Sequence, residues 1–302
     1  MRFLFVDRIL ALEPGKVVRG LKHITHDDVY VSPDEQGRFV FMPSMIGETL
    51  GQLAAWNVMV SCDFKQRPVA GVVARVSPHR NVYVGETLIL ESFIDSLDQT
   101  AVQYHSVARV GDDVVFTIDG ALGPMLPMSD FIDEPSVRRQ FAEIDRPGEW
   151  VNASHTGEYN VLLPAPSPRS CVPMLFDRVI ESEPGVLLRA AKRISYSAPY
   201  LPDHFPNKPV LPMTVLLECK LNLVREFLSR AGFGAGFAKH YRVQELRKIK
   251  MSDFVYPGDQ LVCTLTVKHH DGESLVLQYR SEIAGKRVCV LEVALIAERR
   301  LC

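Results

Sequence analysis

The sequence has little net charge, no long apolar run and no charged leader, and each absence narrows what the chain is. Its 302 residues carry a formal net charge of −2, so no bulk field draws it to nucleic acid or to a membrane. The most apolar long run, residues 45–60, is too short to cross a bilayer and contains Glu48 and Gln52. No positive stretch followed by an apolar one opens the sequence, so we do not expect secretion.

The cysteines and glycines lack the spacing that several classes of site require. The six cysteines form no C-x-x-C pair and no dense framework, so we expect reduced thiols in a cytoplasmic protein. No residues have metal-ligand spacing, and no glycine-rich phosphate loop is present. The sequence therefore predicts neither a metal nor a cofactor.

What the sequence does contain is an internal repeat. Residues 5–25, FVDRILALEPGKVVRGLKHIT, match residues 175–195, LFDRVIESEPGVLLRAAKRIS, at a constant offset of 170. Further on, VYVGETL at 82–88 matches VYPGDQL at 255–261 at a slightly larger offset. A repeat of this extent and order indicates two copies of one folding unit.

Each copy shows the same order of elements. A strand, an E-P-G turn and a second strand precede a long apolar helix, at about 44–62 and again at about 213–230. A helix that is apolar on nearly every side must be wrapped, so we predict an α+β unit with a curved antiparallel sheet around a central helix. We expect such domains at 1–126 and 168–302, a pseudo-dimer within one chain, joined by a proline- and serine-rich linker at 127–167. A further homodimer is left open.

One segment of the second copy concentrates groups that suit proton transfer. Residues 201–219 read LPDHFPNKPVLPMTVLLEC, in which a proline-stiffened loop holds His204 in place at low entropic cost. The helix that begins near Met213 offers unpaired N–H groups to an oxygen that gains negative charge, and Glu218 follows on that helix. A base, an acid and an oxyanion site at one place suit proton abstraction next to a thioester carbonyl.

This segment resembles the 3-hydroxyacyl-ACP dehydratases of fatty acid synthesis, of the FabA/FabZ type. Their signature is an H-F-P-G loop, then P-G, then an acidic residue in an E-A-M-A-Q-like helix. Here H-F-P stands at 204–206, Pro212 precedes the helix, and Glu218 has the family spacing. The resemblance covers nearly all of 170–300 and extends more weakly over 1–125. It implies a tandem double hotdog fold.

Two family glycines are replaced in this chain. The loop glycine is Asn207, and the glycine that opens the helix is Met213. A side chain at the second position narrows the approach of a substrate oxygen to the backbone.

The first copy departs from the family in the complementary way. It has Asp34 or Glu35 where the histidine would stand, yet Glu48 and Gln52 occupy the positions of the family's E-x-x-x-Q. In dimers of the family, the histidine of one subunit faces the acidic residue of the partner's helix. The resemblance therefore implies one composite site, in which His204 faces Glu48 across the seam between the halves.

The implied activity is removal of water from a 3-hydroxyacyl thioester, carried by acyl carrier protein, to give a trans-2-enoyl thioester for fatty acid or polyketide synthesis. The expected catalytic residues are His204 and Glu48, with Glu218 as second choice if each domain works alone. The expected substrate-binding residues are Gln52, Phe205, Pro212 and Met213.

Two other functions and one surface stay open at this point. A hotdog thioesterase would need a carboxylate that activates water, and it would leave the H-F-P loop unexplained. A non-catalytic partner of another dehydratase is the other alternative. A basic stretch either meets the acidic carrier protein or is a solvated strand edge; it comprises Lys239, His240, Arg242, Arg247, Lys248 and Lys250.

Overall fold

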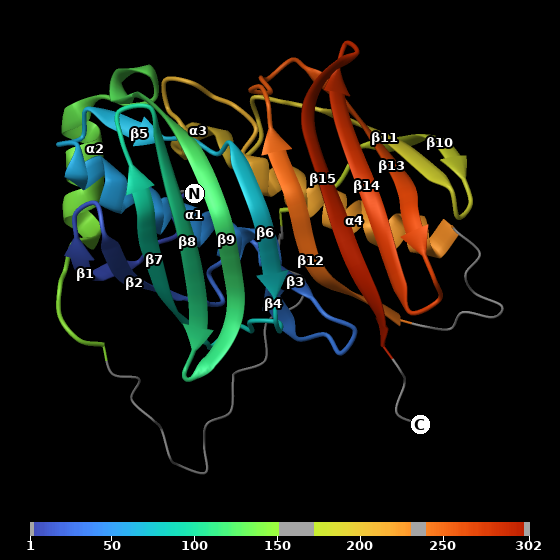
Figure 1. The fold of residues 1–302 in the computed structure, drawn as a ribbon, viewed down its shortest axis with the longest axis horizontal. Coiled ribbons are helices and arrows are strands. Elements are labelled where there is room, and N and C mark those ends of the chain that lie inside the picture. Colours follow the sequence, from blue (N-terminus) through green and yellow to red (C-terminus); the bar gives the residue numbers. More distant parts are fainter. Residues whose placement is uncertain (1–2, 151–171, 231–239, 299–302) are drawn as a thin grey trace.

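The computed structural model describes residues 3–150, 172–230 and 240–298 (Figure 1). The first half of the chain forms β1 (Arg8–Glu13), β2 (Val17–His23), β3 (Val31–Pro33), β4 (Phe39–Phe41), α1 (Pro43–Ser61), β5 (Gln66–Pro68), β6 (Val72–Pro78), β7 (Thr87–Leu97), β8 (Ala101–Val110) and β9 (Asp113–Pro127). A short 3-10 helix, η1 (Met128–Asp130), and α2 (Glu134–Ile144) follow. The second half forms β10 (Arg178–Glu183), β11 (Leu187–Arg193), α3 (Leu201–His204), α4 (Met213–Arg230), β12 (His240–Met251), β13 (Gln260–His270), β14 (Ser274–Ile283) and β15 (Lys286–Glu298).

All strands except β3 and β4, which form a separate two-stranded sheet, join into one antiparallel sheet. Its order is β1-β2-β7-β8-β9-β6-β12-β15-β14-β13-β11-β10. From either edge inward, the corresponding strands of the two halves follow in the same order. The halves meet where β6 pairs with β12, with Val76 opposite Leu246 and Val73 opposite Ile249. This arrangement places the two long helices behind one continuous sheet, as Figure 1 shows.

The two long helices have the burial that their apolar sequences predict. Helix α1 begins with Pro43, whose fixed backbone angle suits the first turn of a helix, and it buries residues on all its faces. Helix α4 is buried along most of its length too, and even Lys220 in its middle is fully covered. The predicted sheet around a central helix is therefore present in both halves.

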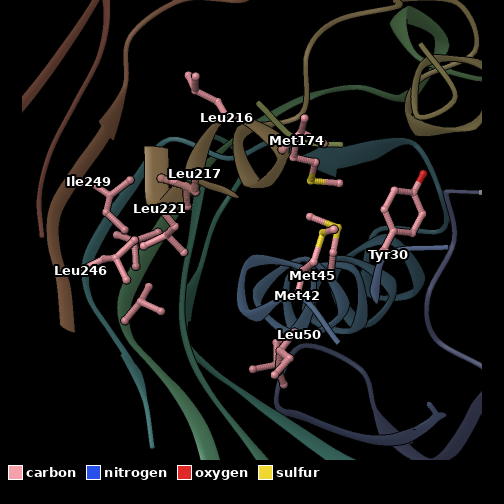
Figure 2. Packing of buried hydrophobic residues seen from close by; sticks show 14 of the residues in the cluster. Tyr30, Met42, Met45, Leu50, Met174, Leu216, Leu217, Leu221, Leu246 and Ile249 are labelled. Carbon is pink, nitrogen blue, oxygen red and sulfur yellow. The ribbon is translucent and has the colours of Figure 1, made fainter. Parts of the chain in front are cut away.

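The core continues across the seam between the halves. Met42 and Met45 at the start of α1 face Met174 of the second half (Figure 2). Val76 of β6 and Leu246 of β12, which are paired across the seam, belong to the same cluster. Because this apolar contact is continuous, the halves form one packed body.

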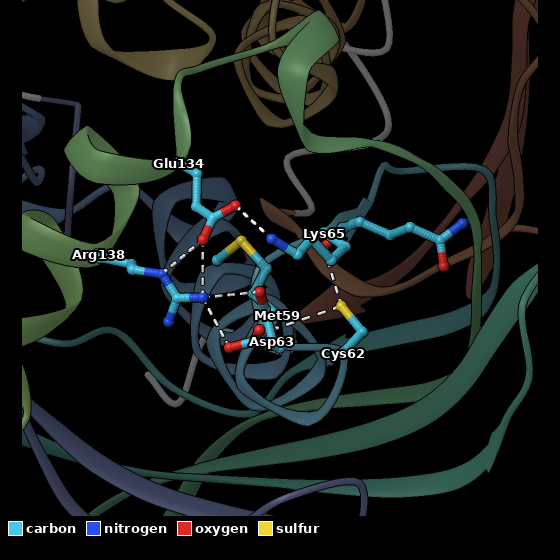
Figure 3. Close-up of polar contacts among 7 residues, drawn as sticks. Met59, Cys62, Asp63, Lys65, Glu134 and Arg138 are labelled. Atoms are coloured by element: carbon cyan, nitrogen blue, oxygen red, sulfur yellow. Dashed lines mark hydrogen bonds and ion pairs between the residues drawn. The ribbon is translucent and has the colours of Figure 1, made fainter.

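Part of the predicted linker is folded. Helix α2 spans Glu134–Ile144, and Asp133 caps it by accepting a hydrogen bond from the Ser136 N–H at 2.9 Å. Arg138 binds Asp63 just beyond α1 at 2.6 Å, and Glu134 binds Lys65 at 2.6 Å (Figure 3). These contacts hold α2 against the end of α1. The division into 1–126, 127–167 and 168–302 stays a prediction, and 151–167 lies outside the described residues.

The described residues bear on three expectations: no membrane-spanning segment, no metal site and reduced cysteines. In these residues no helix is long and apolar enough to span a membrane, and no group of His, Cys, Asp and Glu side chains is arranged to hold a metal. Cys62, Cys219, Cys263 and Cys289 are free thiols, whereas Cys171 and Cys302 lie outside the described residues.

Candidate active site

A large cavity runs along the seam between the halves, and the predicted catalytic residues line it. Its volume is about 770 Å³, which lies in the range of pockets for small molecules. Glu48 of α1 and His204 of the second half both line it, and both also line a smaller neighbouring cavity of about 50 Å³. Glu218 lines the large cavity but not the small one. The composite pair predicted from the sequence is thus brought to one place.

His204 is the last residue of α3 and is enclosed by aromatic rings. Its ring lies 3.9 Å from that of Phe205 and meets the edge of Phe3 at 5.6 Å, centroid to centroid. Its Nδ1 is buried and has no hydrogen-bond partner among the described residues. Burial, and then the nearby positive charge of Arg67, lower the pKa of His204 to about 3. The imidazole is therefore neutral at physiological pH, as a proton acceptor must be.

The loop after His204 is held by the segment that follows β9. The Asn207 N–H donates to the Phe131 carbonyl at 2.8 Å, at the position where the family signature has glycine. The Phe131 ring meets Phe205 edge to face at 4.7 Å, and the Lys208 ammonium lies 5.2 Å from the Phe131 centroid. A residue from the predicted linker thus fixes the loop that carries the histidine.

Glu48 is half-buried on α1, and both of its carboxyl oxygens accept hydrogen bonds. Thr214, at the start of α4, donates its hydroxyl to Oε2 at 2.5 Å. The Gln52 amide, one turn further along α1, donates to Oε1 at 2.9 Å. Burial raises the pKa of Glu48, against the opposing effect of these two hydrogen bonds. Compared with an exposed glutamate, the carboxyl is therefore shifted toward its protonated form, the form that can act as a general acid.

Glu218 occupies the mirror position on α4. Its side chain is buried, and its Oε2 accepts hydrogen bonds from the Ser44 hydroxyl at 2.7 Å and the Ser44 N–H at 3.3 Å. Ser44 and Thr214 are related by the same offset of 170 as Glu48 and Glu218. Burial raises the pKa of Glu218 as well. The two carboxyls therefore have matching surroundings, and only Glu48 shares both cavities with the histidine.

Arg67 adds a positive charge to the site. It lies on the three-residue strand β5, and its guanidinium carbon stands 4.2 Å above the Phe205 ring. It lines both cavities together with His204 and Glu48. Burial lowers the pKa of Arg67 to about 10, with the charge of Glu48 acting in the opposite direction. At neutral pH the group remains a cation.

Comparisons with known proteins show which family the chain resembles. The family model described as FabA-like domain matches residues 168–293. The 3-hydroxyacyl-[acyl-carrier-protein] dehydratase FabZ of Thermoanaerobacter sp. (strain X514) is 36% identical over 124 residues, which are 39% of this chain and 83% of that protein. The FabZ of Helicobacter acinonychis (strain Sheeba) is 34% identical over 131 residues, 42% of this chain and 83% of that protein.

The chain belongs to the FabA/FabZ-type hotdog family. Solved structures extend the likeness in fold over both halves. The dehydratase domain of PpsC from Mycobacterium tuberculosis, in complex with C12:1-CoA, matches with a TM-score of 0.56 at 12% identity and covers 99% of this chain and 100% of its own. The 12:0-ACP thioesterase from Umbellularia californica matches with a TM-score of 0.51 at 12% identity and covers 93% and 94%. The predicted tandem double hotdog is confirmed.

The expected substrate-binding residues of this FabA/FabZ-type chain fall into three groups. Phe205 and Met213 line the large cavity as predicted. Pro212 lines neither cavity; it precedes α4, where its carbonyl accepts the Leu216 N–H at 3.2 Å, and its contact with substrate stays a prediction. Gln52 lines both cavities, but its amide N–H groups are taken by Glu48 and by the Phe3 carbonyl at 3.1 Å. Gln52 therefore orients Glu48.

In the first copy, Asp34 or Glu35 stands where the histidine would be, and Asp34 stabilises a turn. Asp34 lies in the tight turn between β3 and β4 and accepts hydrogen bonds from the Arg38 guanidinium at 2.9 and 2.8 Å. Neither Asp34 nor Glu35 lines the two cavities. The end of the large cavity near Glu218 therefore has no carboxylate or imidazole from this turn.

The basic stretch is partly neutralised by one buried carboxylate. Glu292 on β15 binds Arg247 at 3.0 Å, Lys248 at 3.2 Å and, more closely, Lys268. Lys239 lies outside the described residues. β12 pairs with β6 on one side and with β15 on the other, so these residues do not lie at a strand edge, and the network favours a solvated face of the sheet over a docking surface.

Sequence reasoning missed three polar residues of the site. Thr214 and Ser44 carry a signal, since the offset of 170 pairs two hydroxyls just as it pairs the two glutamates. Arg67 carries none, because it lies outside the family signature on a strand that is defined only by its pairing with β9.

Proposed function

We propose that this protein removes water from a 3-hydroxyacyl thioester at a single composite site formed by His204 and Glu48. The observation that carries the proposal is that these two residues, from opposite halves of the chain, line the same two cavities. The resemblance to FabZ proteins over one hotdog unit supports the reaction class.

The reaction would begin at the histidine. Neutral His204 takes the proton from C2, and the electrons of the broken C–H bond move toward the thioester carbonyl oxygen. Glu48 gives its proton to the hydroxyl at C3 as the C3–O bond breaks, so water leaves and a C2–C3 double bond forms. The imidazolium and the carboxylate that remain exchange a proton, directly or through water, before the next turnover.

The hydrogen bonds around Glu48 suit this cycle. The Thr214 hydroxyl and the Gln52 amide stabilise the carboxylate produced by proton donation, while burial favours the acid before it. The reverse hydration uses the same groups, so the geometry suits either direction.

The carrier and the chain length are parts of the same proposal. Acyl carrier protein is proposed as the carrier because the FabZ relatives are named for it. The volume of about 770 Å³ and the apolar lining by Val73, Val76 and Leu246 suit a medium-length acyl chain. We propose a chain of about twelve carbons as the first to test, the length named for two structural neighbours.

The test is turnover by the purified chain alone. With a 3-hydroxydodecanoyl thioester on acyl carrier protein, we expect enoyl absorbance without release of free thiol. His204→Ala should lower the rate by at least about 100-fold, as expected for loss of a general base. His105→Ala, at an exposed histidine paired with Asp95 on the sheet, is the matched control and should keep full activity. Release of free thiol without enoyl product would establish a thioesterase instead, and turnover in neither assay would leave a non-catalytic partner.

A further inference from the structure

Arg67 is a half-buried cation that the reaction scheme above does not use. Its Nε is buried and has no hydrogen-bond partner among the described residues. Its guanidinium carbon lies beside two rings that pack on each other, 4.2 Å from the centroid of Phe205 and 5.4 Å from that of Phe131. These contacts position the group while leaving N–H donors without an acceptor. A buried charge in this state is costly unless a ligand completes it.

The surroundings do not supply that ligand. Glu48 is the carboxyl whose charge acts on Arg67, yet its two oxygens accept from Thr214 and Gln52. When Glu48 is protonated, as its burial favours, Arg67 has no counter-charge from it. The cavities that Arg67 lines with His204 are where a substrate would bring one.

The proposed reaction needs a group that stabilises negative charge on the thioester oxygen. Elimination through C2 places negative charge on the thioester oxygen, and an enzyme gains most by binding that oxygen as the charge forms. The family signature has glycine where Met213 opens α4, and the Met213 side chain lines the large cavity. That side chain narrows the space through which the oxygen could approach the backbone N–H groups at the start of α4.

We propose that Arg67 donates hydrogen bonds to the thioester carbonyl oxygen and stabilises the negative charge that develops there. This inference rests on the proposed dehydration, and it adds a catalytic residue that lies outside the family signature. No bond forms to Arg67: the oxygen takes up charge as His204 removes the C2 proton, and it returns to a neutral carbonyl when the hydroxyl leaves. Arg67 keeps its protons throughout.

The first experiment measures binding without turnover, so it decides on Arg67 whatever the protein's reaction. Dodecanoate carries a negative oxygen at the place of the thioester carbonyl, and dodecanol is its uncharged counterpart. By titration calorimetry on the full chain, Arg67→Met should weaken dodecanoate binding by about 10- to 100-fold, the range for a lost charge-assisted hydrogen bond. Binding of dodecanol should change little, and Arg67→Lys should fall between.

The chain offers a matched control away from the cavities. Arg189 on β11 pairs with Glu181 at 2.7 Å and lines neither cavity. Arg189→Met should leave dodecanoate affinity unchanged. Equal dodecanoate affinity in wild type and Arg67→Met, or an equal loss in Arg189→Met and Arg67→Met, would overturn the proposal.

The second experiment tests the catalytic role. With the 3-hydroxydodecanoyl thioester, Arg67→Met should lower kcat by about 100- to 1000-fold and change KM little, as for loss of an oxyanion donor. Arg67→Lys should recover part of the rate, since it restores the charge without the forked geometry. A higher KM with unchanged kcat would refute the role in the transition state. If wild type shows no dehydration, the proposed function fails by itself, and the dodecanoate result still decides whether Arg67 holds an oxyanion.

Discussion

Thr214 at the start of α4 donates a hydrogen bond of 2.5 Å to Glu48 in the middle of α1, across the seam between the two halves. The mirror contact, from Ser44 to Glu218, measures 2.7 Å. A duplicated unit has thus kept both reciprocal contacts, although only Glu48 lines both cavities together with His204. Each variant at the proposed site has a counterpart at the mirror position. Effects on catalysis can therefore be measured separately from effects on stability.

The two glutamates should differ in activity and agree in stability. We expect Glu48→Gln to lower the dehydration rate by about 100-fold or more, since an amide cannot donate the proton that the leaving hydroxyl needs. Glu218→Gln should keep the rate within a few-fold. Both changes retain an oxygen that accepts from the neighbouring hydroxyl, so each should alter the free energy of unfolding by only about 1 kcal/mol. Initial rates and thermal melts of the two variants make the comparison, and the opposite order of rates would refute the composite site.

The hydroxyl of Thr214 should matter for rate more than its mirror does. Thr214→Val keeps the shape of the side chain but removes the donor to Glu48, so the carboxylate left after proton donation is less stabilised. We expect kcat to fall by about 10-fold, with KM nearly constant. Ser44→Ala removes the equivalent donor to Glu218 and should leave kcat unchanged. An equal loss in both variants would indicate a purely structural role for these contacts.

Much of the fold follows from patterns within short stretches of sequence. The apolar run that predicts a helix at 213–230 forms α4 with the same bounds, and the run at 44–62 forms α1 one residue earlier. The four-residue spacing of Glu48 and Gln52 predicts their contact, because side chains one helical turn apart are neighbours. Local periodicity and helix geometry are enough for such features.

The remaining features depend on contacts between distant segments. The role of Phe131 in holding the histidine loop was not predicted, because the proline and serine content of its surroundings indicated a linker. Arg67 enters the site only because β5 pairs with the end of β9, a contact that no local pattern encodes. The continuous sheet likewise depends on the pairing of β6 with β12 across the repeat. Composition and periodicity do not report such pairings.

The basic residues on β12 should contribute to stability and not to recognition of a carrier protein. The Glu292 side chain is 4% exposed and joins Arg247 and Lys248 to the sheet. Glu292→Gln should therefore lower the free energy of unfolding by about 1–2 kcal/mol, a value reduced by the partial exposure of the cations. The double change of Arg247 and Lys248 to alanine should leave KM for the carrier-bound substrate within about two-fold. Denaturant unfolding and steady-state kinetics measure the two effects. If the double variant raises KM at low salt but not at high salt, these residues form a docking surface for the carrier protein.

The buried neutral state of His204 should make the protein less stable in acid. Its pKa is about 3 in the folded chain and near 6.5 in an unfolded one, so between these values the unfolded chain binds more protons. The free energy of unfolding should therefore fall as pH drops below about 6.5, by at most about 1.4 kcal/mol for each pH unit from this residue. The raised pKa values of Glu48 and Glu218 act with the opposite sign above their ordinary value of 4.5, and they are common to wild type and variant. His204→Asn should flatten the acid side of a plot of melting temperature against pH, whereas His105→Asn should not. If His204→Asn and wild type lose the same stability between pH 6.5 and pH 4, the imidazole is not held neutral by burial.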